Sequence, residues 1–150
     1  MQIIEYFASE RQAHWLAQIK KSEWDAGQLL YTLLAEGRFR QATGARSRVL
    51  LLTEGDALMA YCTYAEKDDI QPTDLTPWMG FVFTFPPYRG HHYAGVLMQE
   101  ALRLARAEHA QNIYISTGHV GLYEKYGCEL YAILPDLHGA PSRVYVKRVE

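Results

Sequence analysis

Arginine, histidine and glycine residues gather between Pro87 and Val96, directly after the most hydrophobic strand-like stretch of the chain. An amphipathic helix pattern follows the segment, which reads Y-R-G-H-H-Y-A-G. The first-turn N–H groups of a helix that starts here have no partners within that helix, and the helix dipole adds partial positive charge. Arg89 adds a full charge. These residue types suit an anion site, phosphate above all. They also suit a plain turn between a strand and a helix.

Several better-known sites are excluded at this segment. No G-x-x-x-x-G-K-[ST] sequence occurs, so the loop is not of the Walker type. No G-x-G-x-x-G sequence opens a first strand–helix–strand unit, so a dinucleotide-binding fold has no support. His91 and His92 are unsuitable as a metal pair, because adjacent side chains diverge and no third ligand is evident. We therefore expect no metal site.

Two motifs resemble those of the GNAT superfamily, the acyl-CoA-dependent N-acyltransferases. The family's pyrophosphate loop reads [RQ]-x-x-G-x-[GA] after a V-x-P strand end, and residues 89–94 match it with His92 at the glycine position. The strand end reads Thr84-Phe85-Pro86 in place of V-x-P. Leu122–Cys128 (LYEKYGC) resembles the family's LYEKxGF segment. The resemblance covers most of the chain in element order and implies an acetyl-CoA-dependent N-acetyltransferase.

The resemblance also implies where acetyl-CoA, as cosubstrate, would bind. Its pantetheine arm would lie along the strand that precedes the loop, and its pyrophosphate would accept hydrogen bonds from the loop amides. The implied cofactor-binding residues are Val82, Thr84, Arg89, Gly90, His91, His92, Tyr93, Ala94 and Gly95. An acceptor amine would then attack the thioester directly.

Two residues are expected to move protons. Tyr123 matches the family's tyrosine that protonates the leaving thiolate, with Tyr126 as its competitor three residues on. A phenol with a pKa near about 10 can do this without being ionised at neutral pH. Deprotonating an alkylammonium at neutral pH costs roughly 4–5 kcal/mol, which a general base would partly offset. His119 is the candidate base, and a surface imidazole is the alternative reading.

Hydrophobic periodicity predicts the element order β-α-α-β-β-β-α-β-α-β-β. The expected strands are 3–7, the two runs on either side of the E-G-D turn at 54–56, 78–85, 112–117, 128–134 and 142–149. One helix is expected after Ser9, a second one ends near Gly37, a third spans 92–109, and a short one ends at Gly127. A right-handed crossover joins the strands at Trp78 and Ile115. We expect one domain over residues 1–150, with a GNAT-like, mostly antiparallel α/β sheet flanked by helices.

Composition limits the partners. With 15 basic and 17 acidic residues, the chain lacks the basic face that nucleic acid requires. The longest apolar run is too short to span a bilayer, and the start of the chain is too charged for a signal peptide. Two cysteines without a CxxC partner suit a reducing compartment. We expect a cytoplasmic protein that acts on a small-molecule or peptide amine, with a homodimer left open.

Three questions stay open in the sequence. The acidic run Glu66–Asp74 is read as a solvated loop, and the sharper hypothesis is that it attracts a cationic amine. The arginines of Gly37–Arg48 are solvated, or they contact the 3′-phosphate of CoA or an acidic partner. The function itself has two alternatives: an enzyme of the same fold that uses another acyl-CoA or another nucleophile, and a CoA-binding regulatory or interaction module without turnover.

Overall fold

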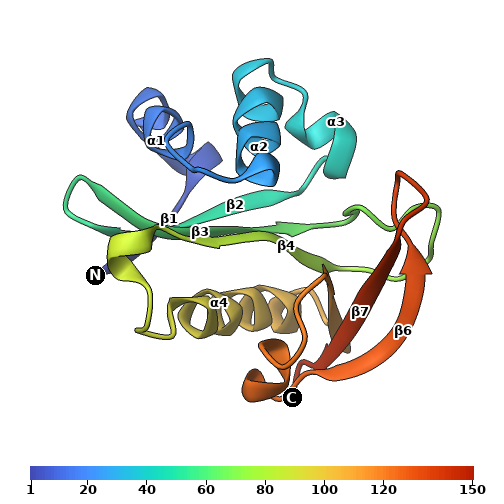
Figure 1. Ribbon diagram of the computed structural model, residues 1–150. Coiled ribbons are helices and arrows are strands. Elements are labelled where there is room, and N and C mark those ends of the chain that lie inside the picture. The colour runs from blue at the N-terminus through green and yellow to red at the C-terminus, as the bar shows by residue number, and fades with distance from the viewer.

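A seven-stranded sheet carries helices on both faces in the computed structural model, which describes all residues 1–150 (Figure 1). The helices α1 (Gln12–Ile19), α2 (Asp25–Ala35) and α3 (Phe39–Thr43) lie on one face, and α4 (Tyr93–Ala107) lies on the other. The strands are β1 (Gln2–Glu5), β2 (Arg48–Glu54), β3 (Ala57–Ala65), β4 (Trp78–Thr84), β5 (Asn112–Thr117), β6 (Glu129–Pro135) and β7 (Pro141–Arg148). They lie in the order β1-β2-β3-β4-β5-β7-β6.

The predicted fold class is confirmed. Every strand pair is antiparallel except β4 with β5, which are parallel and joined through α4 as the crossover. The order of long elements agrees with the periodicity, and the expected short helix near Gly127 is the 3₁₀ turn η3 (Tyr123–Tyr126). None of the helices combines the length and the apolar character that a bilayer-spanning segment needs.

The N-terminal boundaries differ from the prediction. The first strand ends at Glu5, and the residues after it form the 3₁₀ turn η1 (Tyr6–Ala8). Ser9 does not cap α1, because its Oγ accepts a hydrogen bond from the Arg11 N–H (3.0 Å) and closes a separate turn. The helix therefore begins three residues after Ser9.

The arginine-rich segment Gly37–Arg48 contains a short helix, α3, that the periodicity did not indicate. The Arg40 guanidinium lies 3.9 Å from the centroid of the Phe7 ring, and its Nε donates to the Ser47 carbonyl. In Figure 1, α3 lies at the end of the sheet opposite the turn that leads into α4. This placement does not support the hypothesis that these arginines contact the 3′-phosphate of CoA.

Two apolar layers sandwich the central strands. Leu50 and Leu52 of β2 belong to the cluster under α4, and Val49 and Leu51 belong to the cluster under α1 and α2. Successive side chains on a strand point to opposite faces, so one uninterrupted apolar run fills both layers. The two layers hold β2, β3 and β4 as a rigid platform.

A buried hydrogen bond ties the α1–α2 connection to the sheet. The Tyr61 hydroxyl of β3 lies 2.8 Å from Ser22 Oγ, which donates to the Ile19 carbonyl. Gly27 of α2 packs against this pair, and a Cβ at residue 27 would lie 2.5 Å from Tyr61 Oη and 2.8 Å from Ser22 Cβ. The missing side chain allows α2 to lie this close to β3.

Replacing Gly27 by alanine tests this contact. Helix propensity alone predicts that Gly27→Ala stabilises the protein by roughly 0.5–1 kcal/mol. The clash with Ser22 and Tyr61 predicts the opposite sign, a loss of about 1–3 kcal/mol in the free energy of unfolding measured with urea. A stabilised variant would show that the helix is not held against β3 by this contact.

Candidate active site

Strands β4 and β5 are paired only where they begin. Trp78 is in register with Tyr114, and the Tyr114 N–H donates to the Pro77 carbonyl (3.0 Å). Beyond this point β5 pairs with β7 along its whole length, Asn112 to Thr117. The edge of β4 that faces β5 therefore has no strand partner from residue 79 to residue 84. Unpaired backbone groups need a partner, and an extended ligand with amide groups can supply one.

A bulge distorts β4 at the centre of this free edge. Tyr61 pairs with Phe83 and Thr63 pairs with Gly80, so two residues of β4 lie opposite Cys62 alone. Phe81, one of the two, has a φ of 47°, in the left-handed region that a bulky side chain rarely adopts. Such strain costs on the order of 1–3 kcal/mol and gathers at functional sites. The bulge was not evident in the sequence.

The turn after β4 presents backbone N–H groups without partners. A 3₁₀ turn, η2 (Pro86–Tyr88), ends the strand, and the Arg89 N–H donates to the Pro86 carbonyl. The amides of Gly90, His91 and His92 donate to no carbonyl or side chain. Gly90 has a φ of 90° and open space on its Cβ side. Together with the first-turn amides at the start of α4, these groups can bind an anion.

Two residues of the loop have a clear backbone role. His92 caps α4 with a φ of 59° and a ψ of 34°, which explains why the related motif has glycine at this position. The His92 carbonyl accepts from the N–H groups of Gly95 and Val96, so the Gly95 amide is already used. A Cβ at residue 95 would lie 2.7 Å from the Tyr126 ring. Gly95 thus allows α4 and η3 to approach, and the amides left for a ligand end at Ala94.

The other predicted cofactor-binding residues lie along one path from strand to helix. Val82 packs against the cluster under α4, and Thr84 pairs with Ala60 of β3. The exposed Arg89 donates from Nε to the Thr84 carbonyl (2.9 Å), and its guanidinium lies 5.6 Å from the centroid of the Phe83 ring. Arg89 therefore lies back along β4 and places its charge where the strand ends and the turn begins.

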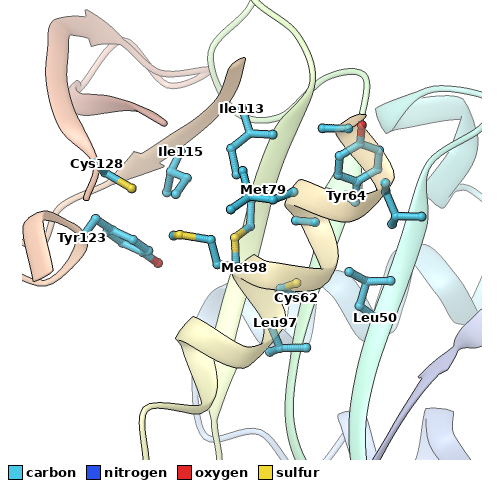
Figure 2. Packing of buried hydrophobic residues seen from close by; sticks show 14 of the residues in the cluster. Leu50, Cys62, Tyr64, Met79, Leu97, Met98, Ile113, Ile115, Tyr123 and Cys128 are labelled. Atoms are coloured by element: carbon cyan, nitrogen blue, oxygen red, sulfur yellow. The ribbon is translucent and has the colours of Figure 1, made fainter. Parts of the chain in front are cut away.

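Tyr123 stands on η3 and points into the layer between α4 and the sheet. Figure 2 shows its ring extending from η3 toward Met98, with the hydroxyl leading. The residue is 3 % exposed, and its hydroxyl has no hydrogen-bond partner within the chain. Burial raises the pKa of Tyr123, and negative charge on the Cys62 and Cys128 thiols, on Tyr126 and on Asp68 would raise it further. The phenol keeps its proton at neutral pH and can donate it.

His119 is the one predicted catalytic residue that the fold leaves outside the layer around Tyr123. It follows β5 on an exposed stretch, and its backbone N–H donates to Thr117 Oγ1 (3.0 Å). Its imidazole makes no hydrogen bond. Its role as a base stays a prediction.

Two carboxylates of the acidic run differ from the solvated loop expected of it. The Oδ1 atoms of Asp68 and Asp69 are both buried without a hydrogen-bond partner. Asp68 lies against Gly80, because a Cβ at residue 80 would lie 2.8 Å from its Cγ. A glycine inside an otherwise apolar strand is the signal that could have revealed this approach.

Comparison with known proteins identifies the family. The model of the acetyltransferase (GNAT) family matches residues 9–128, most of the chain. The chain belongs to the GNAT acetyltransferase family. The match spans both the turn at Arg89 and the segment around Tyr123, and the resemblance to the family is confirmed.

Solved GNAT structures share the fold at low identity. An Escherichia coli GNAT family N-acetyltransferase, solved with CoA, is 22 % identical, with coverage of 99 % of this chain and 81 % of that chain and a TM-score of 0.68. The aminoglycoside 6′-N-acetyltransferase of Enterococcus faecium is 13 % identical, with coverage of 100 % and 98 % and a TM-score of 0.68. The spermidine N-acetyltransferase of Vibrio cholerae, solved with CoA and spermine, is 15 % identical, with coverage of 98 % and 94 % and a TM-score of 0.60. Among curated proteins, no relative matches the sequence.

The left-handed backbone of His92 in this GNAT acetyltransferase predicts opposite responses at two adjacent histidines. His92→Gly should leave the free energy of unfolding unchanged or raise it, because glycine adopts this conformation freely. His91, whose φ is not positive, is the matched control, and His91→Gly should cost about 0.4–1 kcal/mol through the entropy of the unfolded chain. Urea titrations of both variants check this, and equal losses would contradict it.

Proposed function

We propose that the chain is an N-acetyltransferase that moves the acetyl group of acetyl-CoA to a primary amine of a small molecule or peptide. One observation carries the proposal: the unpaired edge of β4 runs directly into a turn whose amides at Gly90, His91 and His92 are free. A ligand that carries amides in an extended arm and a diphosphate at its end matches this order of unpaired groups.

Acetyl-CoA is such a ligand, and the residues present fit it. Its pantetheine arm would bind along Val82 and Thr84, where β5 has left the strand. Its pyrophosphate would accept hydrogen bonds from the amides between Gly90 and Ala94, with the charge of Arg89 nearby. The open space beside Gly90 leaves room for phosphate oxygens at the turn.

Tyr123 is the proposed general acid. The amine attacks the thioester carbonyl, the C–N bond forms, and the C–S bond breaks as the intermediate collapses. The departing thiolate takes a proton from the Tyr123 hydroxyl. Because burial raises the pKa of this phenol, it remains protonated across the neutral range and has the proton to give.

The decisive assay measures release of free thiol from acetyl-CoA across a panel of amines. The panel contains ethanolamine, spermidine, an aminoglycoside and a lysine-containing peptide. Amine-dependent thiol release supports the proposal, and faster release from a different acyl-CoA would reassign the donor. Binding of acetyl-CoA by calorimetry with no release from any amine would favour a binding module without turnover.

Removal of the Tyr123 hydroxyl should affect turnover and leave cosubstrate binding intact. Tyr123→Phe keeps the ring in the apolar layer, so we expect kcat to fall by about 10²–10³-fold while the calorimetric Kd for CoA changes little. Tyr126→Phe is the control, because its ring contact with Gly95 does not involve the hydroxyl. An unchanged kcat in Tyr123→Phe, or an equal fall in both variants, would remove Tyr123 from this role.

Charge reversal at Arg89 should weaken CoA binding in a salt-dependent way. Arg89→Glu places a negative charge beside the proposed diphosphate, so we expect a roughly tenfold higher Kd at low salt and a smaller difference at high salt. Lys21→Glu makes the same change of net charge at an exposed position on the other face of the sheet. Calorimetric titration that finds wild-type affinity in Arg89→Glu would refute the assignment.

A further inference from the structure

Three buried oxygen atoms without hydrogen-bond partners come from β3 and from the loop that precedes β4. They are Thr63 Oγ1, Asp68 Oδ1 and Asp69 Oδ1. An unsatisfied buried acceptor costs on the order of 1–3 kcal/mol. All three can accept a hydrogen bond, and the side chains of Asp68 and Asp69 are close enough to interact with each other.

The strand register places Thr63 and Asp68 beside the same residue of β4. Thr63 of β3 is fully buried and pairs with Gly80 of β4, so the two residues present the same face of the sheet. Gly80 has no side chain, and the Asp68 carboxyl occupies the space that a Cβ would need. The bulge at Phe81 follows immediately. Thr63 and Asp68 therefore lie next to the part of β4 where its edge becomes free.

Asp68 and Tyr123 lie on opposite sides of the strand layer. Met79 and Tyr123 belong to the cluster under α4, and Gly80 presents the other face because side chains alternate along a strand. The charge of Asp68 contributes, after burial and nearer groups, to the raised pKa of Tyr123, so the two residues are within electrostatic range. A thioester beside the free edge would have a phenol on one side and a carboxylate on the other.

We propose that Thr63, Asp68 and Asp69 bind the primary ammonium of the acceptor and that Asp68 is the general base that deprotonates it. This inference rests on the proposed N-acetyltransferase function and names its acceptor as a cationic primary amine. A primary ammonium has three N–H donors, one for each unpartnered oxygen. A carboxylate pair also attracts a cation before it accepts a proton.

The electrostatics of Asp68 suit a base. Burial, followed by the negative charge of Asp69, raises the pKa of Asp68 to about 7. No ionisable side chain comes from β4, whose residues 78–84 are W-M-G-F-V-F-T. On the α4 side, the charge of Asp68 acts on Tyr123 and raises its pKa. A carboxylate with a pKa near the working pH can accept the ammonium proton and return it to solvent.

The proton balance closes with these two residues. The ammonium loses one proton to the Asp68 carboxylate, and the neutral amine forms the C–N bond at the thioester carbonyl. The C–S bond then breaks, and the thiolate takes the Tyr123 proton. After the attack the nitrogen still carries an extra proton. It loses this proton to solvent, and solvent returns a proton to the Tyr123 phenolate. Asp68 releases its proton to bulk water, so the net products are the amide, the thiol and one proton.

The test compares pH profiles of thiol release for the wild type, Asp68→Asn and Asp74→Asn, using the best amine of the panel above. Asp74→Asn removes a carboxylate from an exposed position of the same loop and should match the wild type. In the wild type kcat/KM should rise with pH through about 7, where Asp68 becomes a carboxylate. Asp68→Asn should lose about 10²–10³-fold at neutral pH, lack that limb, and recover only as hydroxide deprotonates the amine. The Kd for CoA should not change.

Stability separates a base from a structural residue. A carboxyl whose pKa is raised on folding contributes stability at low pH that is lost as the pH rises through about 7. Asp68→Asn removes this loss, so its melting temperature should equal or exceed that of the wild type at neutral pH. Gly80→Ala, whose Cβ displaces the carboxyl, should reproduce the loss of activity.

The outcomes separate the two proposals. A wild type that releases no thiol with any amine refutes the proposed function. If the wild type is active and Asp68→Asn keeps the rise of kcat/KM with pH through about 7, the role of Asp68 is refuted and the proposed acetyltransferase function stands. A fall in activity that is uniform over pH and accompanied by a lower melting temperature would show a structural role and also refute the base.

Discussion

The separation of β4 from β5 is the constraint on which the rest of the site depends. The two strands are parallel and share a register only at Trp78 and Tyr114, because β5 is committed to β7 along its full length. Central strands of a sheet normally have partners on both edges. Along most of β4 the edge toward β5 lacks one, so its backbone groups are available to a ligand. The turn at Gly90 continues the same line of unpaired groups. An extended cosubstrate with amides in its arm and a diphosphate at its end would match this series of unpaired backbone groups.

Local rules of backbone and packing are broken at several points along this line. Phe81 and His92 adopt left-handed backbone that favours glycine, and Gly80 interrupts an apolar strand. Each feature is unfavourable or neutral for stability when considered alone. Their concentration along one path is what separates a binding site from an ordinary strand, turn and helix.

Burial raises the pKa of both proposed proton carriers, Tyr123 and Asp68, and suits them to different roles. A low-dielectric surrounding disfavours the charged form, so the pKa values of both the Tyr123 phenol and the Asp68 carboxyl rise. The phenol starts far above neutrality and becomes a firmly protonated acid. The carboxyl starts far below and is moved toward neutrality, where it can act as a base. One strand layer separates the two, which would keep the attacking amine and the leaving thiolate apart.

The sequence by itself determined the order of the long elements, the turn at Arg89 and the context of Tyr123, because periodicity, glycine positions and short motifs are local properties. It missed α3, the bulge at Phe81 and the true ends of the first strand and helix, all of which depend on packing against other segments. Only the tertiary structure decided that the Oδ1 atom of Asp68 is buried and that its carboxyl lies against Gly80, while His119 is exposed. A run of acidic residues in a sequence predicts a solvated loop. Whether one of its side chains is buried depends on neighbours that lie far away along the chain.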